Sequence, residues 1–423
     1  MSVVPAYPLI EGFWIRNYKA IRQIALGSSF QQFAVMDGES DFVPYELSPL
    51  TVLVGESGTG KSCILDALHF IADCLTQGLD EAIAQRGGYD AIYYRGGVGP
   101  VAFGIVFRYN AEPTPLTYIL NIDKLPTGRG YIETEAILYR NAETGQPRPV
   151  LFFQNGEKST RRVQPWYHAS SSDLESVKKI DNKTLALKTL ARIEDLPDIP
   201  QFAQYLSQYF IASFTSSNAS SLSPTKFKLN QTENLASDLK RVKAKHPHEF
   251  DNIFNAVAKR IPGWERVEYK LTESGKPILS IYKTGMTEPV FPAQVSESDL
   301  RLLALLTLLE DPIPPRMLGL ENPATNLAPA HTVAFAKSIR RYLQQFGATQ
   351  FFLTTHSNVL IDQMDPTDVW RLYSDPSGNT MASRCLDELQ FQGINLDSVG
   401  PFWWTDYIYR NPAGYQSGIR TAH

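Results

Sequence analysis

A glycine-rich segment at residues 55–62 carries the strongest chemical signal in this 423-residue chain. Its residues are, in order, Gly55, Glu56, Ser57, Gly58, Thr59, Gly60, Lys61 and Ser62. Glycines at these positions let the backbone curl until its N–H groups point at phosphate oxygens. At this spacing the lysine ammonium would reach the β- and γ-phosphates of a nucleotide, and the Ser62 hydroxyl would hold Mg²⁺. We interpret the segment as a nucleotide site.

Glu321 and His356 are two further polar residues that follow apolar runs. Residues 317–321 are typical of a buried strand that ends in Glu321, and residues 350–354 of a second strand that His356 follows. In open α/β sheets, ligands bind beyond the carboxyl ends of the strands. Because the phosphate loop also follows an apolar, β-branched run, at 51–54, we expect the three features to meet at one site.

The segment 295–301 is a further candidate for anion binding. Ser296 stands where an N-cap is expected, Asp299 follows three residues later, and the stretch 302–309 is strongly apolar. A helix N-terminus attracts an anion through its free N–H groups and its dipole. The pattern fits a phosphate-binding helix start, and it also fits an ordinary capped core helix.

The elements that must position these groups are those of an α/β protein. Apolar residues recur with helical period after the phosphate loop, and several other stretches alternate as strands do. The remaining expected elements are short strands within 8–54 (among them 31–36), strands at 101–109, 117–123, 131–140 and within 265–283, a polar loop at 155–183, a linker at 213–221, and helices at 184–211, 232–260 and 330–345.

These patterns divide the chain into three units. We expect an N-terminal lobe at 1–150 with the phosphate loop, an inserted unit at 151–290, and a C-terminal lobe at 291–423. The insertion shows no sustained heptads, which predicts a compact, mainly helical lid and not a coiled-coil arm. The expected fold is therefore α/β, with a mixed β-sheet, an N-terminal antiparallel β-layer and the inserted lid.

The composition limits the class of protein. Hydrophobic residues make up 43%, enough for a sizeable core, and the formal net charge of -4 argues against a surface coated for nucleic acid. The 3 cysteines are widely spaced, so we expect reduced thiols. The first ten residues lack a signal-peptide pattern, and no apolar run approaches the length of a membrane span. We expect a cytoplasmic protein.

Several residues fit two roles each. Phe13, Trp14 and Tyr18 fit adenine stacking, and they also fit a place in the core. Arg95 lies in a glycine-bracketed loop, where it would approach a phosphate or occupy a solvated turn.

Two further segments are candidates for binding a partner. The run 240–245 is the best nucleic-acid candidate in the sequence, although it also fits a solvated helix face. Its cations are Lys240, Arg241, Lys243 and Lys245. The aromatic segment 402–409 fits a docking surface or a core role.

The order of these motifs resembles the ABC-type ATPase heads of RecF, SMC and OLD proteins. It is most similar to compact bacterial relatives with an AAA label, many of which come from phage-defence or toxin-like operons. The phrases at 15–21 and 232–236 are similar to that family too. The resemblance covers about 8–140 and 230–410, discontinuously. It implies a P-loop ATPase head.

The resemblance also implies a role for the nucleotide-binding motifs. Gly55–Ser62, with Cys63 directly after it, would be the Walker A loop that binds ATP. Met317–Glu321 would be the Walker B strand. Mg²⁺ would then be held at Ser62 and Glu321. The cofactors that follow from the family are ATP and Mg²⁺.

In the same family, two heads sandwich two nucleotides. The resemblance implies that Ser296–Arg301 is the signature segment and that His356 is the switch histidine at the γ-phosphate. Ser296 and Ser298 of one subunit would cap the ATP bound to the other. A homodimer, or a higher assembly built from such dimers, is therefore expected.

Three positions depart from the family pattern. Asn322 stands where the family usually has a second acid that polarises the attacking water, and a neutral amide cannot accept the proton. Ser298 replaces a signature glycine, and Ala328 replaces a polar residue that many relatives carry. We infer slow or absent hydrolysis, unless another carboxylate such as Asp299 of the partner subunit serves as the base.

These inferences give one main hypothesis and two alternatives. The chain would be a sensor or scaffold subunit that uses ATP as a clamp beside a separate effector, a nuclease or toxin, in antiviral defence. The first alternative is a DNA-dependent ATPase of repair or recombination that resembles RecF. The second is a non-enzymatic binding module for which nucleotide is a structural ligand.

Overall fold

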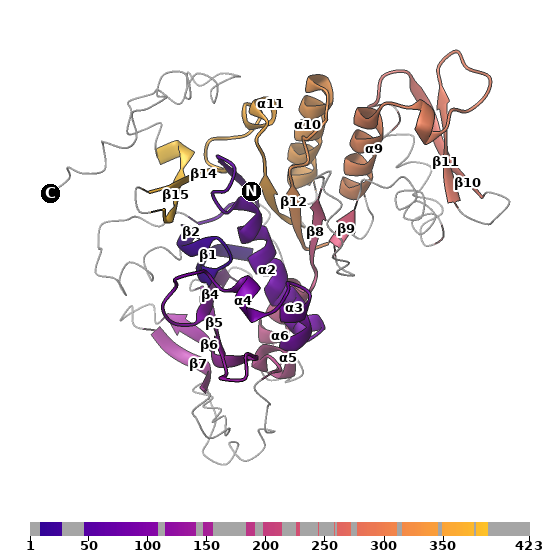
Figure 1. Cartoon of the computed structure of the whole chain (residues 1–423). Coiled ribbons are helices and arrows are strands. Elements are labelled where there is room, and N and C mark those ends of the chain that lie inside the picture. Colours follow the sequence, from indigo (N-terminus) through magenta and orange to yellow (C-terminus); the bar gives the residue numbers. More distant parts are fainter. Residues whose placement is uncertain are drawn as a thin grey trace.

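In the computed structural model, two large β-sheets of the described residues meet at one helix, α2 (Lys61–Thr76), and a two-stranded hairpin forms a third sheet (Figure 1). It describes residues 9–27, 46–108, 115–140, 147–154, 183–190, 198–213, 226–228, 260–271, 277–310, 315–345, 349–375 and 378–387, together with Ala244 and Ala258. In these ranges, no helix has the length and apolar character needed to cross a membrane.

The first sheet is the antiparallel layer expected near the N-terminus. Within the described ranges it has six strands in the order β2-β1-β4-β5-β6-β7, each antiparallel to its neighbour. Its strands are β1 (Leu9–Tyr18), β2 (Ile21–Gly27), β4 (Val101–Arg108), β5 (Leu116–Lys124), β6 (Gly130–Arg140) and β7 (Pro147–Gln154). The three strands predicted between residues 101 and 140 are thus confirmed, and β7 extends the meander.

The second sheet is mixed and carries the candidate site. Its described strands follow the order β15-β14-β3-β13-β12-β8-β9, and all neighbours are parallel except β14 and β15. Its strands are β3 (Leu50–Gly55), β8 (Tyr209–Ser213), β9 (Lys226–Lys228), β12 (Met317–Glu321), β13 (Gln350–Thr354), β14 (Val369–Ser374) and β15 (Thr380–Arg384). Parallel order is what aligns the carboxyl ends of β3, β13 and β12 at one edge.

Helices cover both faces of the mixed sheet, and a separate hairpin, β10–β11, projects beyond α9 (Figure 1). The hairpin consists of β10 (Trp264–Leu271) and β11 (Pro277–Lys283), as expected for 265–283. The other described helices are α3 (Leu79–Ala84), α4 (Tyr89–Ile92), α5 (Ala186–Leu190), α6 (Asp198–Ser207), η2 (Pro292–Gln294), α9 (Glu297–Leu309), α10 (Pro329–Gln345) and α11 (Asn358–Ile361).

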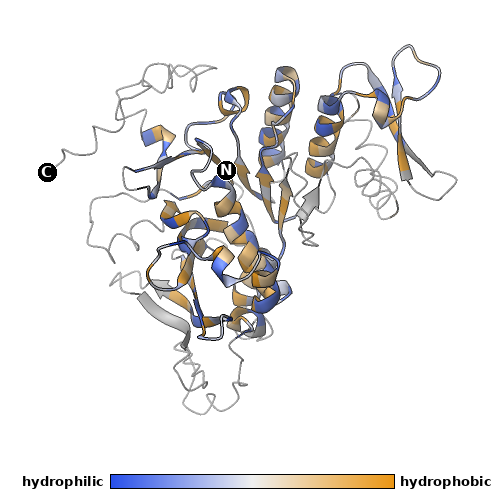
Figure 2. Cartoon of the chain, viewed as in Figure 1, coloured by the Kyte–Doolittle hydropathy of each residue, from blue (hydrophilic) through white to orange (hydrophobic). Residues whose placement is uncertain are grey.

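Alternation along the strands explains why two apolar clusters form. Phe352 of β13 faces the cluster that contains α2 and the first sheet, whereas Phe351 and Leu353 face the cluster that contains α9 and α10. Successive strand residues point to opposite faces, so both faces of a strand like β13 must be apolar to be covered. α10 carries hydrophobic and hydrophilic bands, which matches a helix with one face on the sheet, whereas residues 301–307 of α9 are all buried (Figure 2).

The region 184–211 differs from its prediction as one helical stretch. It contains α5 and α6, and its end forms β8, which pairs with β12 from Tyr209 to Ser213. A five-residue apolar run such as 209–213 has no periodicity that separates strand from helix, and pairing to β12 decides its conformation. Strands β8 and β9, from within 151–290, thus belong to the same sheet as β3; the division into three units stays a prediction.

The residues that fit two roles in the sequence have different outcomes in the structure. Phe13, Trp14 and Tyr18 are buried in β1, so adenine stacking by these rings is wrong and the core role is confirmed. Arg95 is exposed in a turn. Several predicted segments lie outside the described residues: the strand at 31–36, the loop at 155–183 except its last residue, the linker at 213–221 except its first residue, the helix at 232–260 with its basic run except residues 244, 258 and 260, and the aromatic segment 402–409.

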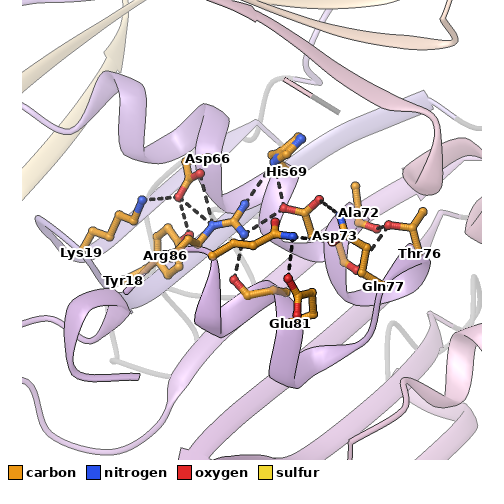
Figure 3. A network of polar contacts seen from close by, with 12 residues as sticks. Tyr18, Lys19, Asp66, His69, Ala72, Asp73, Thr76, Gln77, Glu81 and Arg86 are labelled. Carbon is orange, nitrogen blue, oxygen red and sulfur yellow. Dashed lines mark hydrogen bonds and ion pairs between the residues drawn. The ribbon is translucent and has the colours of Figure 1, made fainter. Parts of the chain in front are cut away.

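A buried ionic network fixes α2 against the turn between β1 and β2 (Figure 3). Asp66 accepts hydrogen bonds from the Tyr18 hydroxyl at 2.6 Å and from Arg86 Nε at 3.2 Å, and it pairs with Lys19. About two turns further along α2, Asp73 pairs with Arg86 Nη1 at 2.8 Å. Arg86 therefore lies between two carboxylates of the helix that follows the phosphate loop.

The network is largely closed to solvent. The side chains of Arg86, Asp66 and Asp73 are 5%, 9% and 1% exposed. Burial alone would raise the pKa of Asp73, but hydrogen bonding and charge from His69 and Arg86 outweigh it and lower that pKa. The charges compensate one another, so the position of α2 depends on all of them being present.

Candidate functional site

The phosphate loop joins β3 to α2, as the sequence predicts. Gly55 has φ 139° and Gly60 has φ 90°, conformations that side chains with a Cβ rarely adopt. A Cβ on Gly55 would lie 2.1 Å from the Leu372 carbonyl oxygen of β14. Helix α2 begins at Lys61, directly after Gly60. The first-turn N–H groups of α2 and the curled loop together offer the donors that a phosphate group needs.

Lys61 is folded into this loop. Lys61 is only 5% exposed, and its Nζ donates to the Gly55 carbonyl at 2.8 Å and to the Glu56 carbonyl at 2.6 Å. It also lies 3.4 Å from Thr59 Oγ1. Burial lowers the pKa of Lys61 to about 8, against the opposing charge of Glu56. A phosphate would be a better partner for this ammonium than neutral carbonyls, because charge-assisted hydrogen bonds are stronger.

This low pKa predicts a pH dependence of phosphate binding. With a pKa of about 8 the ammonium is mostly charged at pH 7 and mostly neutral at pH 9. Only the charged form attracts a phosphate, so we expect ATP affinity to fall roughly tenfold between these pH values. Fluorescent-nucleotide titrations at both pH values test this. Lys61→Arg keeps its charge throughout and should lose the dependence, and equal pH profiles for both proteins would contradict the role of Lys61.

The ends of three strands meet beside the loop. Thr354 at the end of β13 is paired with Glu321 of β12 on one side and with Leu53 of β3 on the other. His356 follows β13 by two residues, and partial desolvation and then the charge of Lys61 lower its pKa. Burial raises the pKa of the Cys63 thiol, and the charge of Glu321 adds to it. The pairing of β12, β13 and β3 brings the three strand ends to one edge of the sheet, as the sequence predicts.

Asn322 follows Glu321 in a left-handed conformation, with φ 49°. Its N–H donates to the Thr354 carbonyl at 3.1 Å and lies 3.2 Å from Thr354 Oγ1. Its side-chain Oδ1 is buried and has no partner among the residues that the structure describes. Buried polar atoms of this kind are usually satisfied by ordered water. The position therefore fits an amide that orients a water molecule beside Glu321.

Ser62 and Glu321 fit a magnesium ion in the type of atom that they offer. Ser62 is exposed at the first turn of α2, and Glu321 is half-buried at the end of β12. Mg²⁺ prefers hard oxygen ligands and usually keeps water and substrate phosphate oxygens in its shell. No cluster of three or more His, Cys, Asp and Glu residues that could hold a metal occurs in the described ranges. The residues thus fit an ion that binds together with a nucleotide.

The segment 296–301 is not assembled with the phosphate loop of the same chain in the contacts that the structure describes. Ser296 caps α9 by accepting from the Asp299 N–H at 3.1 Å, which confirms the predicted cap. Ser298 Oγ accepts from the Ala328 N–H at 2.8 Å and lies 2.7 Å from His331 Nδ1. Sequence reasoning missed His331, because no local pattern reveals a contact across 33 residues.

Comparisons with known proteins place most of the chain in one family. Residues 50–362 match the family described as "AAA domain, putative AbiEii toxin, Type IV TA system". No curated protein gives a significant match. The match spans the phosphate loop, the segment 296–301, Glu321 and His356.

Solved structures of SMC heads are similar to this chain at low identity. An SMC head domain from Thermotoga maritima has 14% identity and a TM-score of 0.42, over 89% of this chain and 98% of that chain. A head with an extended coiled coil, bound to the C-terminal domain of ScpA from Pyrococcus furiosus, has 13% identity and a TM-score of 0.47, over 91% and 99%. A head bound to the C-terminal winged-helix domain of ScpA has 15% identity and a TM-score of 0.42, over 88% and 97%.

Proposed function

The chain belongs to the family described as "AAA domain, putative AbiEii toxin, Type IV TA system", and from this premise we propose that it is an ATP-dependent clamp with weak or absent hydrolysis. Residues 55–62 and the first turn of α2 would bind the phosphates of ATP. Ser62 and Glu321 would hold Mg²⁺, and His356 would face the γ-phosphate. A bound magnesium ion would neutralise phosphate charge and orient the γ-phosphate.

One observation carries this proposal. The phosphate loop and His356 follow β3 and β13, and Glu321 is the last residue of β12, so all three lie at the same edge of one parallel set of strands. Ligands of open α/β sheets bind at such an edge. An isolated strand-end histidine is usually structural, but here partial burial and then the charge of Lys61 in the neighbouring loop lower the pKa of His356, which supports a shared site.

Asn322 supports the second part of the proposal, that ATP is held and not readily hydrolysed. Its amide can orient a water, yet it cannot accept the proton that the water must lose. The free energy of ATP binding then stabilises an assembled state, which persists because ATP is not readily hydrolysed. We propose that this state is a homodimer in which Ser296 and the start of α9 face the nucleotide of the other subunit.

Lys61→Ala tests nucleotide binding directly. Loss of its charge-assisted contacts should weaken ATP binding by about 100-fold, which corresponds to roughly 3 kcal/mol. Equilibrium titration with a fluorescent ATP analogue measures the loss, and gel filtration with ATP should show no dimer. Lys188→Ala is a matched control, because Lys188 donates to the Thr76 carbonyl at the far end of α2. Equal affinity of Lys61→Ala and wild type would contradict the proposed site.

We further propose that the chain acts in the cytoplasm beside a separate effector, a nuclease or toxin, in antiviral defence. The family description names a putative toxin of a toxin–antitoxin system, which supports a setting with a partner protein. Co-expression with the product of a neighbouring gene, followed by gel filtration, should give co-elution that depends on ATP and Lys61. Separate elution under all conditions would count against a partner of this kind.

The two alternatives predict different results in the same assays. A DNA-dependent ATPase would bind DNA with an affinity that falls steeply with salt, and its turnover would rise with DNA. A module in which nucleotide is only a structural ligand would form the same oligomer with ATP and with ADP. The clamp predicts a dimer with ATP that ADP does not support, and no requirement for DNA.

A further inference from the structure

The loop between β12 and α10, residues 322–328, is fastened at both ends. At its first residue, the N–H of Asn322 donates to the carbonyl of Thr354, the last residue of β13. At its other end it contacts the first turns of α9, which lies beside α10 (Figure 1). The loop is therefore the direct physical link between the Glu321 end of the candidate site and the start of α9.

Arg301 makes the central contact of this link. Its Nη1 donates to the Thr325 carbonyl at 2.5 Å, and its Nη2 donates to Glu297 Oε1 at 2.9 Å. The Arg301 side chain is 7% exposed, whereas that of Glu297 is 66% exposed. Asn326 Nδ2 also donates to Glu297 Oε1, at 3.1 Å. A buried guanidinium thus joins the middle of the loop to the first turn of α9, and its planar fork fixes the direction of both bonds.

Ser298 makes a second contact, at the end of the loop. Its hydroxyl accepts from the Ala328 N–H at 2.8 Å, and Ala328 directly precedes Pro329, the first residue of α10. The same oxygen lies 2.7 Å from His331 Nδ1, while His331 Nε2 lies 3.5 Å from Asp299 Oδ1. Ser298 and Ala328, two of the departures from the family pattern, are therefore hydrogen-bonded partners.

The loop itself is tightly wound and has little freedom to absorb a displacement. The Thr325 N–H donates to the Asn322 carbonyl at 3.1 Å, and the Leu327 N–H donates to the Ala324 carbonyl at 3.2 Å. Asn322 and Asn326 both hold left-handed conformations, with φ 49° and 59°, which few residue types adopt at low cost. A shift at one end of such a unit is passed to the other end.

We propose that Arg301 and Ser298 are positioning residues that couple the conformation of Asn322 to that of the first turn of α9. A change at the Glu321 end moves loop 322–328, and these two side chains carry the movement to residues 296–301. The coupling is reciprocal, so a partner that binds the start of α9 also repositions the Asn322 amide. This inference rests on the proposed ATP site, which supplies the change at Glu321.

Hydrogen exchange measured by mass spectrometry tests the coupling without relying on turnover. In wild type, ATP with Mg²⁺ should slow exchange in peptides that cover 55–62, 322–328 and 296–301. In Arg301→Met and in Ser298→Ala, the slowing should remain at 55–62 and fall by at least about fivefold at 296–301. Arg301→Met keeps an apolar stem of similar length, and Ser298→Ala removes only one hydroxyl, which covers the case where one variant fails to fold.

Arg341→Met is the matched control. Arg341 lies on α10 and pairs with Glu310 at 3.1 Å, at the opposite end of α9 from the loop. It should respond to ATP as wild type does. Slowing at 296–301 that persists in both test variants would overturn the coupling, because direct contact with a second subunit would then explain it. Absence of slowing at 55–62 in wild type would contradict ATP binding itself, and the coupling with it.

Discussion

Asn322→Asp is expected to raise ATP turnover by about 10²–10⁴-fold, the usual contribution of a positioned general base. Asp and Asn have similar shapes, and both tolerate the left-handed conformation that Asn322 holds at φ 49°. The substitution therefore adds a carboxylate beside Glu321 while the backbone stays in place. Single-turnover and steady-state phosphate release on the purified variant measure the effect.

Two companion substitutions separate the chemistry from the backbone. Asn322→Gln keeps a neutral amide at the same position and should leave turnover near the wild-type value. Asn322→Glu supplies a carboxylate too, but the longer side chain is strained at positive φ, so we expect a smaller gain than for Asn322→Asp. If Asn322→Asp is as slow as Asn322→Gln, the missing acid is not what limits hydrolysis.

Arg86→Met is expected to lower the free energy of unfolding by about 3–5 kcal/mol, because it leaves Asp66 and Asp73 buried without their shared cation. These carboxylates are 9% and 1% exposed and belong to the helix that follows the phosphate loop. Urea denaturation followed by circular dichroism measures the loss. ATP affinity should fall with it, since α2 is no longer held against the turn between β1 and β2.

An exposed ion pair provides the control for Arg86. Arg129 pairs with Asp80 on the surface, where the side chains are 47% and 42% exposed. Exposed pairs of this kind contribute about 0–1 kcal/mol, so Arg129→Met should change the unfolding free energy little. A loss for Arg86→Met as small as that for Arg129→Met would show that the network is not what fixes α2.

The candidate nucleotide site at the edge of the mixed sheet could be predicted from the sequence because the patterns that indicate it are local. Each of Gly55–Ser62, Glu321 and His356 follows an apolar run of strand length, and the rule for open α/β sheets then brings the three together. The capped start of α9 at Ser296 is equally local, since one side chain bonds an N–H three residues away.

What could not be predicted depends on contacts between distant residues. Strand β8 is an apolar run whose conformation is decided by pairing with β12, more than 100 residues later. The sequence shows Ser298 and Ala328 as two separate departures from the family pattern, and only the fold reveals the hydrogen bond between them. The sequence indicates only that Asn322 replaces a carboxylate, whereas the structure adds a backbone reason for the residue type, its left-handed conformation.

The most direct test of the clamp measures ATP turnover and oligomeric state on the same wild-type sample. We predict a dimer in the presence of ATP and Mg²⁺, with turnover well below the common enzymatic range of about 1–10³ s⁻¹. Light scattering coupled to gel filtration and a phosphate-release assay give the two values. Brisk turnover within that range, together with no gain for Asn322→Asp, would contradict the clamp and indicate a working ATPase in which another residue replaces the missing acid.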